Sequence, residues 1–420
     1  QTLNPHIAAD GFPVRIPTAP EIWNEDRRLA GVSSFGFSGT NVHVVLEAAP
    51  PVDSASVIAD RDAHLLTLSA RDEAALRELA SRYDAHLANT HQSFADLCFT
   101  ANTGRTQFAH RLAVVASDAE ECREKLRSAA PQFVSGKTPR IAFLFTGQGS
   151  QYAGMGMRLY DASPVVRDVI DRCAAACGLP LIEIIRDGSA LDDTIHAQPA
   201  LFAIEMALFA WWRSLGVEPA AVLGHSLGEI AAACAAGVMT LENGARLAAL
   251  RGWLMQSMPR GAMAAVFAAP DMLREYELAA INGPESCVIT GTVEEIDSAI
   301  AALADRGITA KRLAVSHAFH SRMIEPMLDE LRSFASAIAF SAPRIPILSN
   351  LTGAAETSFD SAYWRRHARG TVRFADSIQG VHALGCELFV EIGPHPVLSS
   401  MAREQIAGAE WVPSLRRGAD

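Results

Sequence analysis

The pentapeptide Gly224-His225-Ser226-Leu227-Gly228 restricts the possible folds of this chain more than any other feature. It stands between a short apolar run at 220–223 and an Ala-rich helix predicted at 229–236. A serine between two glycines at such a strand-to-helix junction has the pattern of a nucleophile elbow. The glycines allow a sharp turn, and the serine hydroxyl then projects beside helix amides that can stabilise an oxyanion. Ser226 is therefore a candidate nucleophile. The alternative is an ordinary Gly-Ser turn before a helix.

The sequence around this motif predicts a parallel sheet with covering helices. A continuous apolar run at 141–145 leads into TGQGSQ and then a helix, which is the order of a buried parallel strand. The alternation continues with helices at 199–215 and 241–258 and strands at 345–349 and 387–392. Between them, strand and helix patterns alternate at 262–267, 271–278, 287–290, 293–306 and 310–315. These predict an inserted βαββαβ subdomain.

The N-terminal third has a different organisation. Its first 50 residues read as a Pro-punctuated segment ending in a Gly-rich turn and a strand at 42–47, like the tail of a domain cut upstream. A linker is expected over 48–62. A small α/β unit is expected after it, with Ser69 capping its first helix. Its expected segments are a strand at 64–69, a helix at 72–90, a further segment at 93–103, a strand at 108–116, a helix at 119–129 and a loop at 131–139.

Composition excludes several classes of protein. A chain of 420 residues should hold roughly two to four domains. The net charge of -11 has the wrong sign for a nucleic-acid binder. The seven cysteines are odd in number and scattered, which favours buried free thiols in a reducing cytoplasm. Cys173 and Cys177 lack a partner pair, so a helix face is favoured over a metal site. Neither a secretory signal nor a membrane-spanning run is expected.

A nucleophilic serine needs a base, and the thirteen histidines are the candidates. His317 and His320 follow the strand predicted at 310–315, where loop residues can face a cleft. The residues alone leave both histidines open, with surface positions as the alternative. No carboxylate stands in a setting that identifies it as the partner of the base; this includes Glu229, Asp271 and Glu294.

Two further features could bind an anion. The glycine-rich turn Gly147-Gln148-Gly149 follows the first strand of the predicted sheet and could complete an oxyanion hole or hold a phosphate. Arg251 lies among apolar residues of the helix predicted at 241–258. A partly buried arginine there would pair with a carboxylate, and the alternative is a side chain that extends to solvent.

With these residues identified, the chain resembles the acyltransferase domain of a modular type I polyketide synthase. The motifs FTGQGSQYAGMG, GHSLGE, SHAFHS, SNLTG and FVEIGPHPVL carry the resemblance in this order. The resemblance implies an α/β fold: a large α/β-hydrolase-like parallel-sheet subdomain with an inserted ferredoxin-like subdomain, preceded by a small α/β linker domain. The implied segments are a ketosynthase C-terminal tail (1–50), a ketosynthase-to-acyltransferase linker domain (51–139), the acyltransferase (140–410, with its small subdomain at about 262–318) and the start of the following linker (411–420).

The resemblance also assigns the reacting residues. Ser226 matches the acylated nucleophile and His320 the base, which leaves His317 as a pocket residue. Family members orient the base through a main-chain carbonyl, and the matching position is His367. Thr371 departs from the proline usual in the family close to that position.

Binding roles follow in the same way. The backbone amides of Gln148 and Leu227 match the oxyanion hole. Arg251 matches the residue that pairs with the free carboxylate of the substrate, and Gln198 and Asn282 match polar positions near the site.

The motif HAFH and an aliphatic residue after the nucleophile are typical of members that take malonyl units rather than methylmalonyl. Phe319 would crowd a substituent on the carbon between the carboxyl groups, and Leu227 points the same way. One methyl group is worth only about 1–3 kcal/mol in such pockets, so this predicts a preference.

The implied activity is ping-pong transfer of a malonyl unit from coenzyme A, through an acyl-serine, to the phosphopantetheine thiol of an acyl carrier protein in antibiotic biosynthesis. No metal, redox or tightly bound cofactor is expected. The expected partners are malonyl-CoA, the carrier protein, and the ketosynthase and other domains of the parent synthase. The expected location is the cytoplasm, with neither nucleic acid nor membrane as a partner.

Three alternatives remain open: another extender unit such as methylmalonyl, a hydrolytic editing thioesterase, and a docking scaffold. The N-terminal segment lacks the catalytic cysteine and histidines of a ketosynthase, so condensation is not expected. His43 is expected to be structural, and Phe37 matches a gating-loop position of that domain.

Overall fold

The computed structural model of the protein describes residues 11, 13, 16–17, 19–23, 27–49, 63–134, 136 and 138–418. The chain divides into two units, Gln1–Asp62 and Ala63–Asp420. The linker predicted up to residue 62 lies, from residue 50 onward, outside the described residues. The domain boundaries drawn from the sequence at residues 50, 139 and 410 stay predictions.

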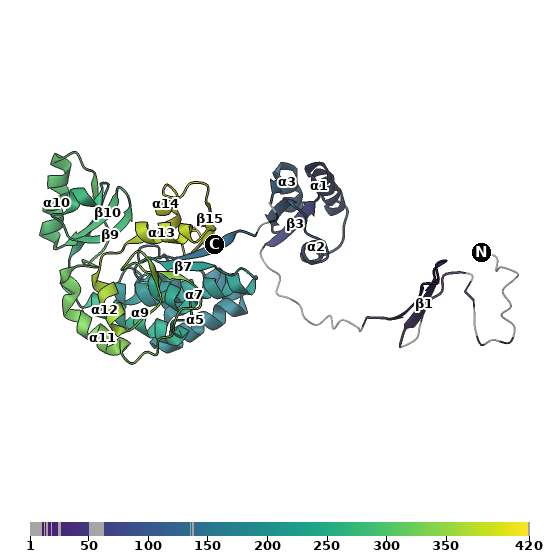
Figure 1. Cartoon of the computed structure of the whole chain (residues 1–420), viewed down its shortest axis with the longest axis horizontal. Helices are drawn as coiled ribbons and strands as arrows, with labels where there is room; N and C mark the ends of the chain where they lie inside the picture. The colour runs from purple at the N-terminus through teal and green to yellow at the C-terminus, as the bar shows by residue number, and fades with distance from the viewer. Residues whose placement is uncertain are drawn as a thin grey trace. The chain divides into compact units, whose positions relative to one another are not determined.

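The first unit contains a β-hairpin (Figure 1). Strands β1 (Leu29–Phe35) and β2 (Asn41–Glu47) pair antiparallel over their whole length, which confirms the strand expected at 42–47. Ser33 Oγ and His43 Nδ1 lie 2.7 Å apart across the two strands. His43 therefore pairs within the hairpin, and Phe37 is fully exposed in the turn.

The second unit begins with a small α/β domain that has a hydrophobic cluster of its own. An antiparallel sheet in the order β3-β4-β5 packs against three helices. Its elements are β3 (His64–Ala70), α1 (Glu73–Leu87), α2 (Phe94–Thr103), β4 (His110–Ala116), α3 (Ala119–Ser128) and β5 (Gln132–Phe133).

Two predictions for this domain were wrong in detail. Ser69 does not cap α1, because β3 continues to Ala70; Asp72 caps the helix instead, accepting a hydrogen bond from the amide of Ala75 at 2.8 Å. The segment expected as a loop at 131–139 contains the edge strand β5, because Gln132 and Phe133 pair with the start of β4.

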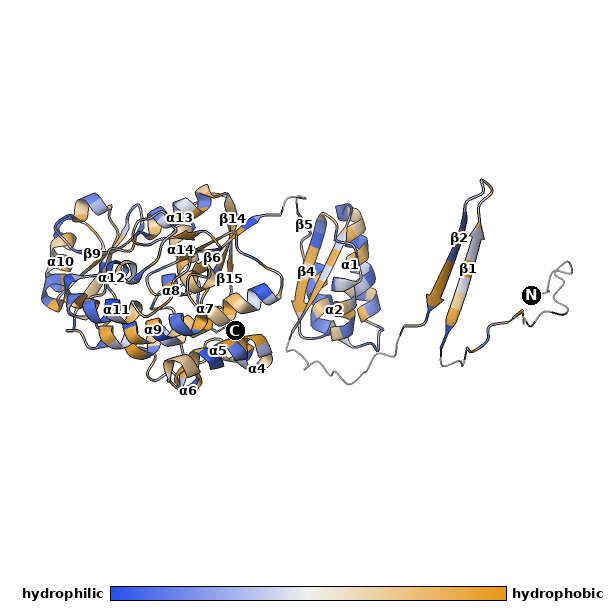
Figure 2. Ribbon diagram, turned by 60° about the horizontal axis from the view of Figure 1, so that its bottom comes forward, coloured by the Kyte–Doolittle hydropathy of each residue, from blue (hydrophilic) through white to orange (hydrophobic). Residues whose placement is uncertain are grey.

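The main sheet has six strands in the order β13-β12-β7-β6-β14-β15, all parallel except the edge strand β13. The strands are β6 (Arg140–Phe145), β7 (Ala221–Gly224), β12 (Ile347–Leu348), β13 (Ala355–Glu356), β14 (Cys386–Ile392) and β15 (Glu410–Pro413). Hydrophobic residues run along β6 and β14 between helices of mixed polarity (Figure 2). Burial on both faces explains why these strands read as continuous apolar runs.

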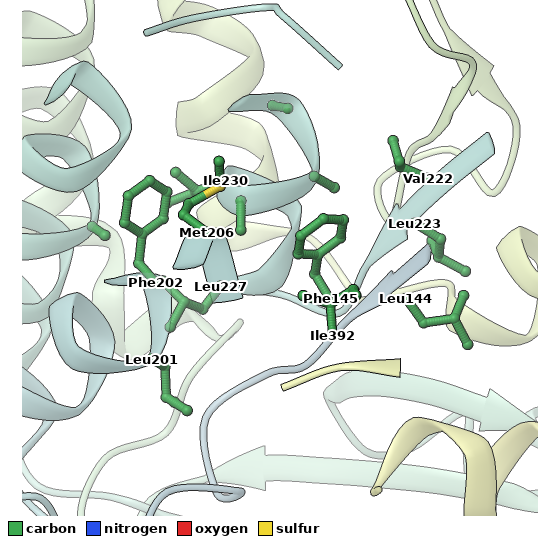
Figure 3. Packing of buried hydrophobic residues seen from close by; sticks show 14 of the residues in the cluster. Leu144, Phe145, Leu201, Phe202, Met206, Val222, Leu223, Leu227, Ile230 and Ile392 are labelled. Atoms are coloured by element: carbon green, nitrogen blue, oxygen red, sulfur yellow. The ribbon is translucent and has the colours of Figure 1, made fainter. Parts of the chain in front are cut away.

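Helices surround this sheet, and α5, α7 and α9 pack against one another (Figure 1). The helices are α4 (Met157–Ala162), α5 (Pro164–Cys177), α6 (Leu181–Asp187), α7 (Thr194–Ser214), α8 (Gly228–Ala235), α9 (Leu241–Gln256), α11 (Leu328–Ala335), α12 (Ser361–Arg369), α13 (Phe374–Ala383) and α14 (Leu398–Ala402), with a 3-10 helix η2 (Arg322–Met327). Figure 3 shows their core, where Phe202 and Met206 of α7 lie near Phe145 of β6 and Leu227.

Helix α7 begins at Thr194, five residues earlier than the sequence indicated. Pro199 was expected to start the helix but lies inside it. Pro199 lies beyond the first turn and removes one intrahelical hydrogen bond, and the many buried residues on α7 supply packing that offsets this loss.

The inserted subdomain forms an antiparallel sheet in the order β11-β8-β10-β9. Its elements are β8 (Ala262–Val266), the 3-10 helix η1 (Pro270–Leu273), β9 (Leu278–Gly283), β10 (Ser286–Gly291), α10 (Val293–Asp305) and β11 (Ala310–Arg312). The helix expected at 271–278 is only the short η1, because Leu278 already begins a strand that pairs with β10. The βαββαβ order itself is confirmed.

The seven cysteines are free, and Cys177 Sγ on α5 lies 3.3 Å from the carbonyl oxygen of Ala245. Within the described parts of the chain, no three His, Cys, Asp or Glu side chains gather as metal ligands would. None of the helices in those parts has the length and apolar character needed to cross a membrane.

Candidate active site

The GHSLG motif forms a sharp turn between β7 and α8. Ser226 has a φ of 53°, a left-handed conformation that is uncommon for a non-glycine residue. A Cβ atom on Gly224 would lie 2.1 Å from the amide nitrogen of Glu229, and one on Gly228 would lie 2.2 Å from the carbonyl oxygen of Phe145. Only glycine fits at either position, so the two glycines allow the turn that presents the Ser226 hydroxyl.

His320 lies within hydrogen-bond distance of this hydroxyl: Ser226 Oγ and His320 Nε2 are 2.7 Å apart. Its other ring nitrogen, Nδ1, is 2.8 Å from the carbonyl oxygen of Gly370. Because a carbonyl can only accept, Nδ1 carries the proton and Nε2 is free to accept the proton of Ser226. Of the two histidines left open by the sequence, the structure pairs His320 with the serine.

The carbonyl that orients His320 is not the one expected. The resemblance pointed to His367, but the acceptor belongs to Gly370. His367 lies in the last turn of α12, where carbonyls point along the helix axis. Gly370 follows the helix with φ -74° and ψ 154°, so its carbonyl is free to turn toward His320. The His367 ring instead lies 6.4 Å from the His320 ring.

The environment keeps His320 neutral. Burial is the main reason that its pKa lies well below the usual value, and the nearby positive charge of Arg251 lowers the pKa further. A neutral imidazole that faces a hydroxyl can act as a general base.

Arg251 lies on α9, is 3% exposed, and points at the same serine. Its Nη2 donates to Ser226 Oγ at 3.1 Å and its Nη1 to Gln198 Oε1 at 2.9 Å. Burial lowers the pKa of Arg251 to about 10, so it remains charged at neutral pH. Within the described residues its side-chain partners are Gln198 and Ser226 rather than a carboxylate, and its buried Nε has no hydrogen-bond partner. A buried cation without an acid suits an anionic ligand.

The glycine-rich loop after β6 reaches the same place. Gln198 Nε2 donates to Gln148 Oε1 at 3.3 Å and lies 3.3 Å from the sulfur of Met255. A Cβ atom on Gly147 would lie 2.9 Å from the carbonyl oxygen of His225, so this loop lies close against the elbow. The structure thus brings Gln148, Gln198, Arg251 and Ser226 together, and Leu227 follows the serine in the chain.

The other expected positions lie nearby without bonding to the serine. His317 is buried, and its Nδ1 lies 2.8 Å from Ser316 Oγ. The Phe319 ring is centred 6.3 Å from the His317 ring, and the Phe319 carbonyl accepts from Thr290 Oγ1. Asn282 Oδ1 lies 2.9 Å from His225 Nε2, so Asn282 contacts the residue before the nucleophile.

Comparison with known proteins decides the family. The family model for the "Acyl transferase domain" matches residues 142–420. The chain belongs to the acyltransferase domains of modular type I polyketide synthases. A second model, "CurL-like, PKS C-terminal", matches residues 64–126, the small α/β domain that precedes the acyltransferase.

Relatives and solved structures agree with this assignment. The acyltransferase chain is 40% identical over 424 residues to the phenolphthiocerol synthesis polyketide synthase type I Pks15/1 of Mycobacterium marinum, a match that covers 94% of the chain and 20% of that synthase. The chain therefore spans about a fifth of the length of this relative.

Two solved structures have the same fold. The acyl transferase domain of SpnD, in complex with 2-(pent-4-yn-1-yl)malonyl, has a TM-score of 0.79 and 35% identity, covering 84% of this chain and 91% of that one. A malonyl-CoA:acyl carrier protein transacylase of Xanthomonas oryzae pv. oryzae has a TM-score of 0.64 and 30% identity, covering 67% and 96%. These similarities confirm the predicted fold class.

The sequence assigned no role to two polar residues at the base of the acyltransferase elbow, although Glu229 stands in the motif GHSLGE and Asn350 in SNLTG. Asn350 Oδ1 accepts from the amide of Ser226 at 2.7 Å, and Glu229 Oε2 accepts from the amide of Asn350 at 2.6 Å. The sequence offers Glu229 only as one of the carboxylates that could partner the base. The position of Asn350 directly after a predicted strand was the signal that could have identified it, because ligands and site residues gather at the carboxyl ends of parallel strands.

Proposed function

We propose that this acyltransferase domain loads a malonyl unit from coenzyme A onto Ser226 and passes it to the phosphopantetheine thiol of an acyl carrier protein. The observation that carries the proposal is the convergence on Ser226 Oγ of His320 Nε2 at 2.7 Å and Arg251 Nη2 at 3.1 Å. A hydroxyl in contact with a neutral base and an unpaired cation is arranged to react with a substrate that carries a carboxylate.

In the first half-reaction, Ser226 Oγ attacks the thioester carbonyl while His320 Nε2 takes the hydroxyl proton. The amides of Gln148 and Leu227 are assigned to the negative oxygen of the tetrahedral intermediate. When the intermediate collapses, the carbon–sulfur bond breaks and His320 returns the proton to the departing thiolate of coenzyme A. The Gly370 carbonyl stabilises the imidazolium that forms between these steps.

The second half-reaction reverses these steps with a different thiol. His320 takes the proton of the phosphopantetheine thiol, whose sulfur attacks the acyl-serine and regenerates Ser226. The reaction balances with one thioester and one thiol, so the proposal includes no tightly bound cofactor. Water entering at this stage would hydrolyse the ester, which is how an editing hydrolase would act.

The choice of malonyl rests on Arg251 and Phe319. A malonyl carboxylate can form a bidentate pair with the buried guanidinium, whereas an acetyl group leaves the cation unpaired. Phe319 is 9% exposed next to His317 and would crowd a branched substituent. The SpnD domain was solved with a substituted malonyl group, so the family fold itself admits larger units and methylmalonyl remains the second candidate.

The proposed partners follow from the reaction and from the family. They are malonyl-CoA, an acyl carrier protein, and the ketosynthase and other domains of a synthase, with the cytoplasm as the proposed location. Residues 1–50 are proposed to be a ketosynthase tail, and residues 51–139, which include the small α/β domain, the linker that follows it.

The test is the intact mass of the protein after brief incubation with malonyl-, methylmalonyl- or acetyl-coenzyme A. We expect a malonyl adduct on the wild type and none on Ser226→Ala. Arg251→Ala should form the malonyl adduct at least about 100-fold more slowly, because the malonyl carboxylate then lacks its charge partner. Arg274→Ala, at an arginine whose side chain is 77% exposed, is the matched control and should label normally.

Each other outcome of this experiment would support a different function or substrate. Equal labelling by acetyl- and malonyl-coenzyme A would remove the role given to Arg251. A stronger methylmalonyl adduct would change the assigned extender unit. Release of free coenzyme A without an adduct would favour hydrolysis, and neither adduct nor release would favour a docking scaffold.

A further inference from the structure

Asn350 is a buried residue that holds the backbone of the elbow through both ends of its amide. It is 1% exposed and follows β12, the neighbour of β7 in the sheet. Its Oδ1 accepts from the amide of Ser226 at 2.7 Å, and its Nδ2 donates to the carbonyl of Gly224 at 2.6 Å. These bonds span the turn whose central residue has a left-handed φ, a conformation that persists only when its surroundings fix it.

The main chain of Asn350 is tied to the segment that orients the base. Its carbonyl accepts from the amide of Arg373 at 2.7 Å. Three residues before Arg373, Gly370 supplies the carbonyl that bonds to His320. A Cβ atom on Gly370 would lie 2.7 Å from Leu351 Cδ1, so the two segments are in close contact. Asn350 therefore stands between the nucleophile and the support of the base.

Glu229 holds the backbone amide of Asn350. Glu229 is fully buried on α8, and its Oε2 accepts from the amide of Asn350 at 2.6 Å. Its Oε1 accepts from the hydroxyl of Tyr363 on α12, and its Oε2 lies 3.4 Å from His367 Nε2. Helices α8 and α12, which flank the elbow and the base-orienting segment, are thus joined through one carboxylate.

We propose that Asn350 is a positioning residue that sets the distance and direction between Ser226 Oγ and His320 Nε2. It does not touch the substrate. This inference rests on the proposed acylation of Ser226. In this proposal Asn350 aligns the Ser226 hydroxyl with the His320 ring. A nucleophile can pass its proton to a base only when the two groups are aligned in this way.

The test measures the rate constant of acylation by malonyl-coenzyme A as a function of its concentration. Asn350→Ala should lower the maximal rate constant by about 100-fold, the typical cost of a misplacement of about 1 Å. The half-saturating concentration should change by less than about two-fold, because Arg251 still binds the carboxylate. An unchanged maximal rate constant in a folded variant would overturn the proposal, as would a loss confined to the half-saturating concentration.

A matched control separates alignment from folding. Asn102, on α2 of the small α/β domain, also bonds the backbone with both ends of its amide: Oδ1 accepts from Thr67 N at 2.9 Å and Nδ2 donates to Leu65 O at 2.7 Å. Asn102→Ala should lower the thermal unfolding temperature without changing the acylation rate constant. Equal losses of rate in Asn102→Ala and Asn350→Ala would contradict a positioning role.

A second variant keeps the test independent of folding. Asn350→Asp preserves the shape and the acceptor for Ser226 N, but its ionised carboxyl places an oxygen against the carbonyl of Gly224. Glu229 is the other acid beside this position, and the neighbouring basic groups are His367 of α12 and, around Ser226, His320 and Arg251. Protonation restores the donor, so the acylation rate of this variant should rise as the pH falls while that of Asn350→Ala does not. A rate that shows no such rise contradicts the proposal.

The reaction of Ser226 with phenylmethylsulfonyl fluoride separates this inference from the proposed function. The serine oxygen displaces fluoride and forms a sulfonyl ester, a reaction that needs the serine–histidine pair but no coenzyme A. If the wild type labels with this reagent but not with malonyl-coenzyme A, the proposed function fails. A 100-fold slower labelling of Asn350→Ala still supports the positioning role, and equal labelling overturns it.

Discussion

At the scale of single residues, the two reacting side chains share an unusual backbone. Ser226 and His320 have φ values of 53° and 55°, and no other non-glycine residue among those that the structure describes has a positive φ. Such strain gathers at functional sites, where neighbouring bonds hold it in place. The glycines on either side of Ser226 indicate a sharp turn in the sequence. No glycine or other turn signal next to His320 predicts its left-handed conformation.

Without the family resemblance, which matches His320 to the base, the local residue pattern could not decide between His317 and His320. Both follow the strand β11 in one loop, three residues apart, and both are buried. The choice depends on a tertiary contact, the carbonyl of Gly370, which lies 50 residues away in the chain. Local pattern can place a histidine near a cleft, but it carries no information about the partner that fixes its tautomer.

The lowered pKa of His320 predicts the pH profile of acylation. Only the neutral imidazole can take the serine proton, and burial keeps His320 neutral to well below pH 6.5. The acylation rate constant of the wild type should therefore be flat between about pH 6 and 8 and should fall only in more acidic solution. Rapid-quench mass measurements across this range check it, with the thermal unfolding temperature as a control for acid denaturation. A half-maximal rate near pH 6.5 would contradict the prediction.

At the scale of elements, apolar periodicity predicted the buried parts well and tertiary contacts decided the rest. The strands β6, β7 and β14 were found within one residue of their predicted bounds, because burial on both faces leaves a continuous apolar signal. The segment 271–278 had a helical pattern but too few residues before β9 to complete a helix. The C-terminal end of α12 matters most for the site, because the carbonyl that orients His320 belongs to Gly370, the residue directly after this helix.

Contacts between elements also explain why Thr371 can stand where the family usually has a proline. Its hydroxyl donates to the carbonyl of Leu278 at 2.7 Å, and the next residue, Val372, exchanges backbone hydrogen bonds with β9. The segment after Gly370 is thus held extended by pairing with the small subdomain. A fixed φ from proline is not required there.

Replacement of an elbow glycine should disrupt this element. The Cβ atom of Gly228→Ala would lie 2.2 Å and 2.4 Å from the carbonyl oxygens of Phe145 and Thr146, so α8 must move away from β6. We expect a loss of about 3 kcal/mol in unfolding free energy and about 100-fold in acylation rate. Denaturant unfolding and the mass assay measure the two effects.

Gly283→Ala is the control for this change. A Cβ atom on Gly283 would meet its nearest neighbour at 3.5 Å, an ordinary contact, and the residue has no positive φ. This variant should stay within about 0.5–1 kcal/mol of the wild type. Losses as large as those of Gly228→Ala would show that any added methyl group in this domain is harmful.

At the scale of the whole molecule, two buried carboxylates join the layers of the main domain. Glu391 on β14 accepts from the amides of Val397, Leu398 and Ser399 at the start of α14. Glu205 on α7 accepts from Thr146 Oγ1 at 2.7 Å, and its second oxygen is buried without a hydrogen-bond partner. The sequence assigned a role to neither acid, although Glu391 stands in the motif FVEIGPHPVL, because a single glutamate in an apolar helix or strand carries no signal of its surroundings.

The environments of Glu205 and Glu391 predict that replacement by glutamine has opposite effects on the unfolding free energy of the domain. Burial raises the pKa of Glu205 well above 4.5, and the charge of Glu391 raises it further. The folded state therefore binds a proton that the unfolded state releases above about pH 4.5. The wild-type unfolding free energy should fall with rising pH, by up to about 1.4 kcal/mol per pH unit from this group, until the folded pKa is reached.

Glu205→Gln removes this titration and keeps the shape, so at pH 8 it should be more stable than the wild type and its unfolding free energy should depend less on pH. Glu391→Gln would instead turn an amide nitrogen toward the backbone amides that surround the carboxylate, which only donate, and should be destabilised by about 1–3 kcal/mol at every pH. Urea unfolding of the three proteins between pH 5 and 8 measures both effects. A Glu205→Gln variant that is less stable than the wild type at pH 8 would mean that the core holds this carboxylate in its charged form.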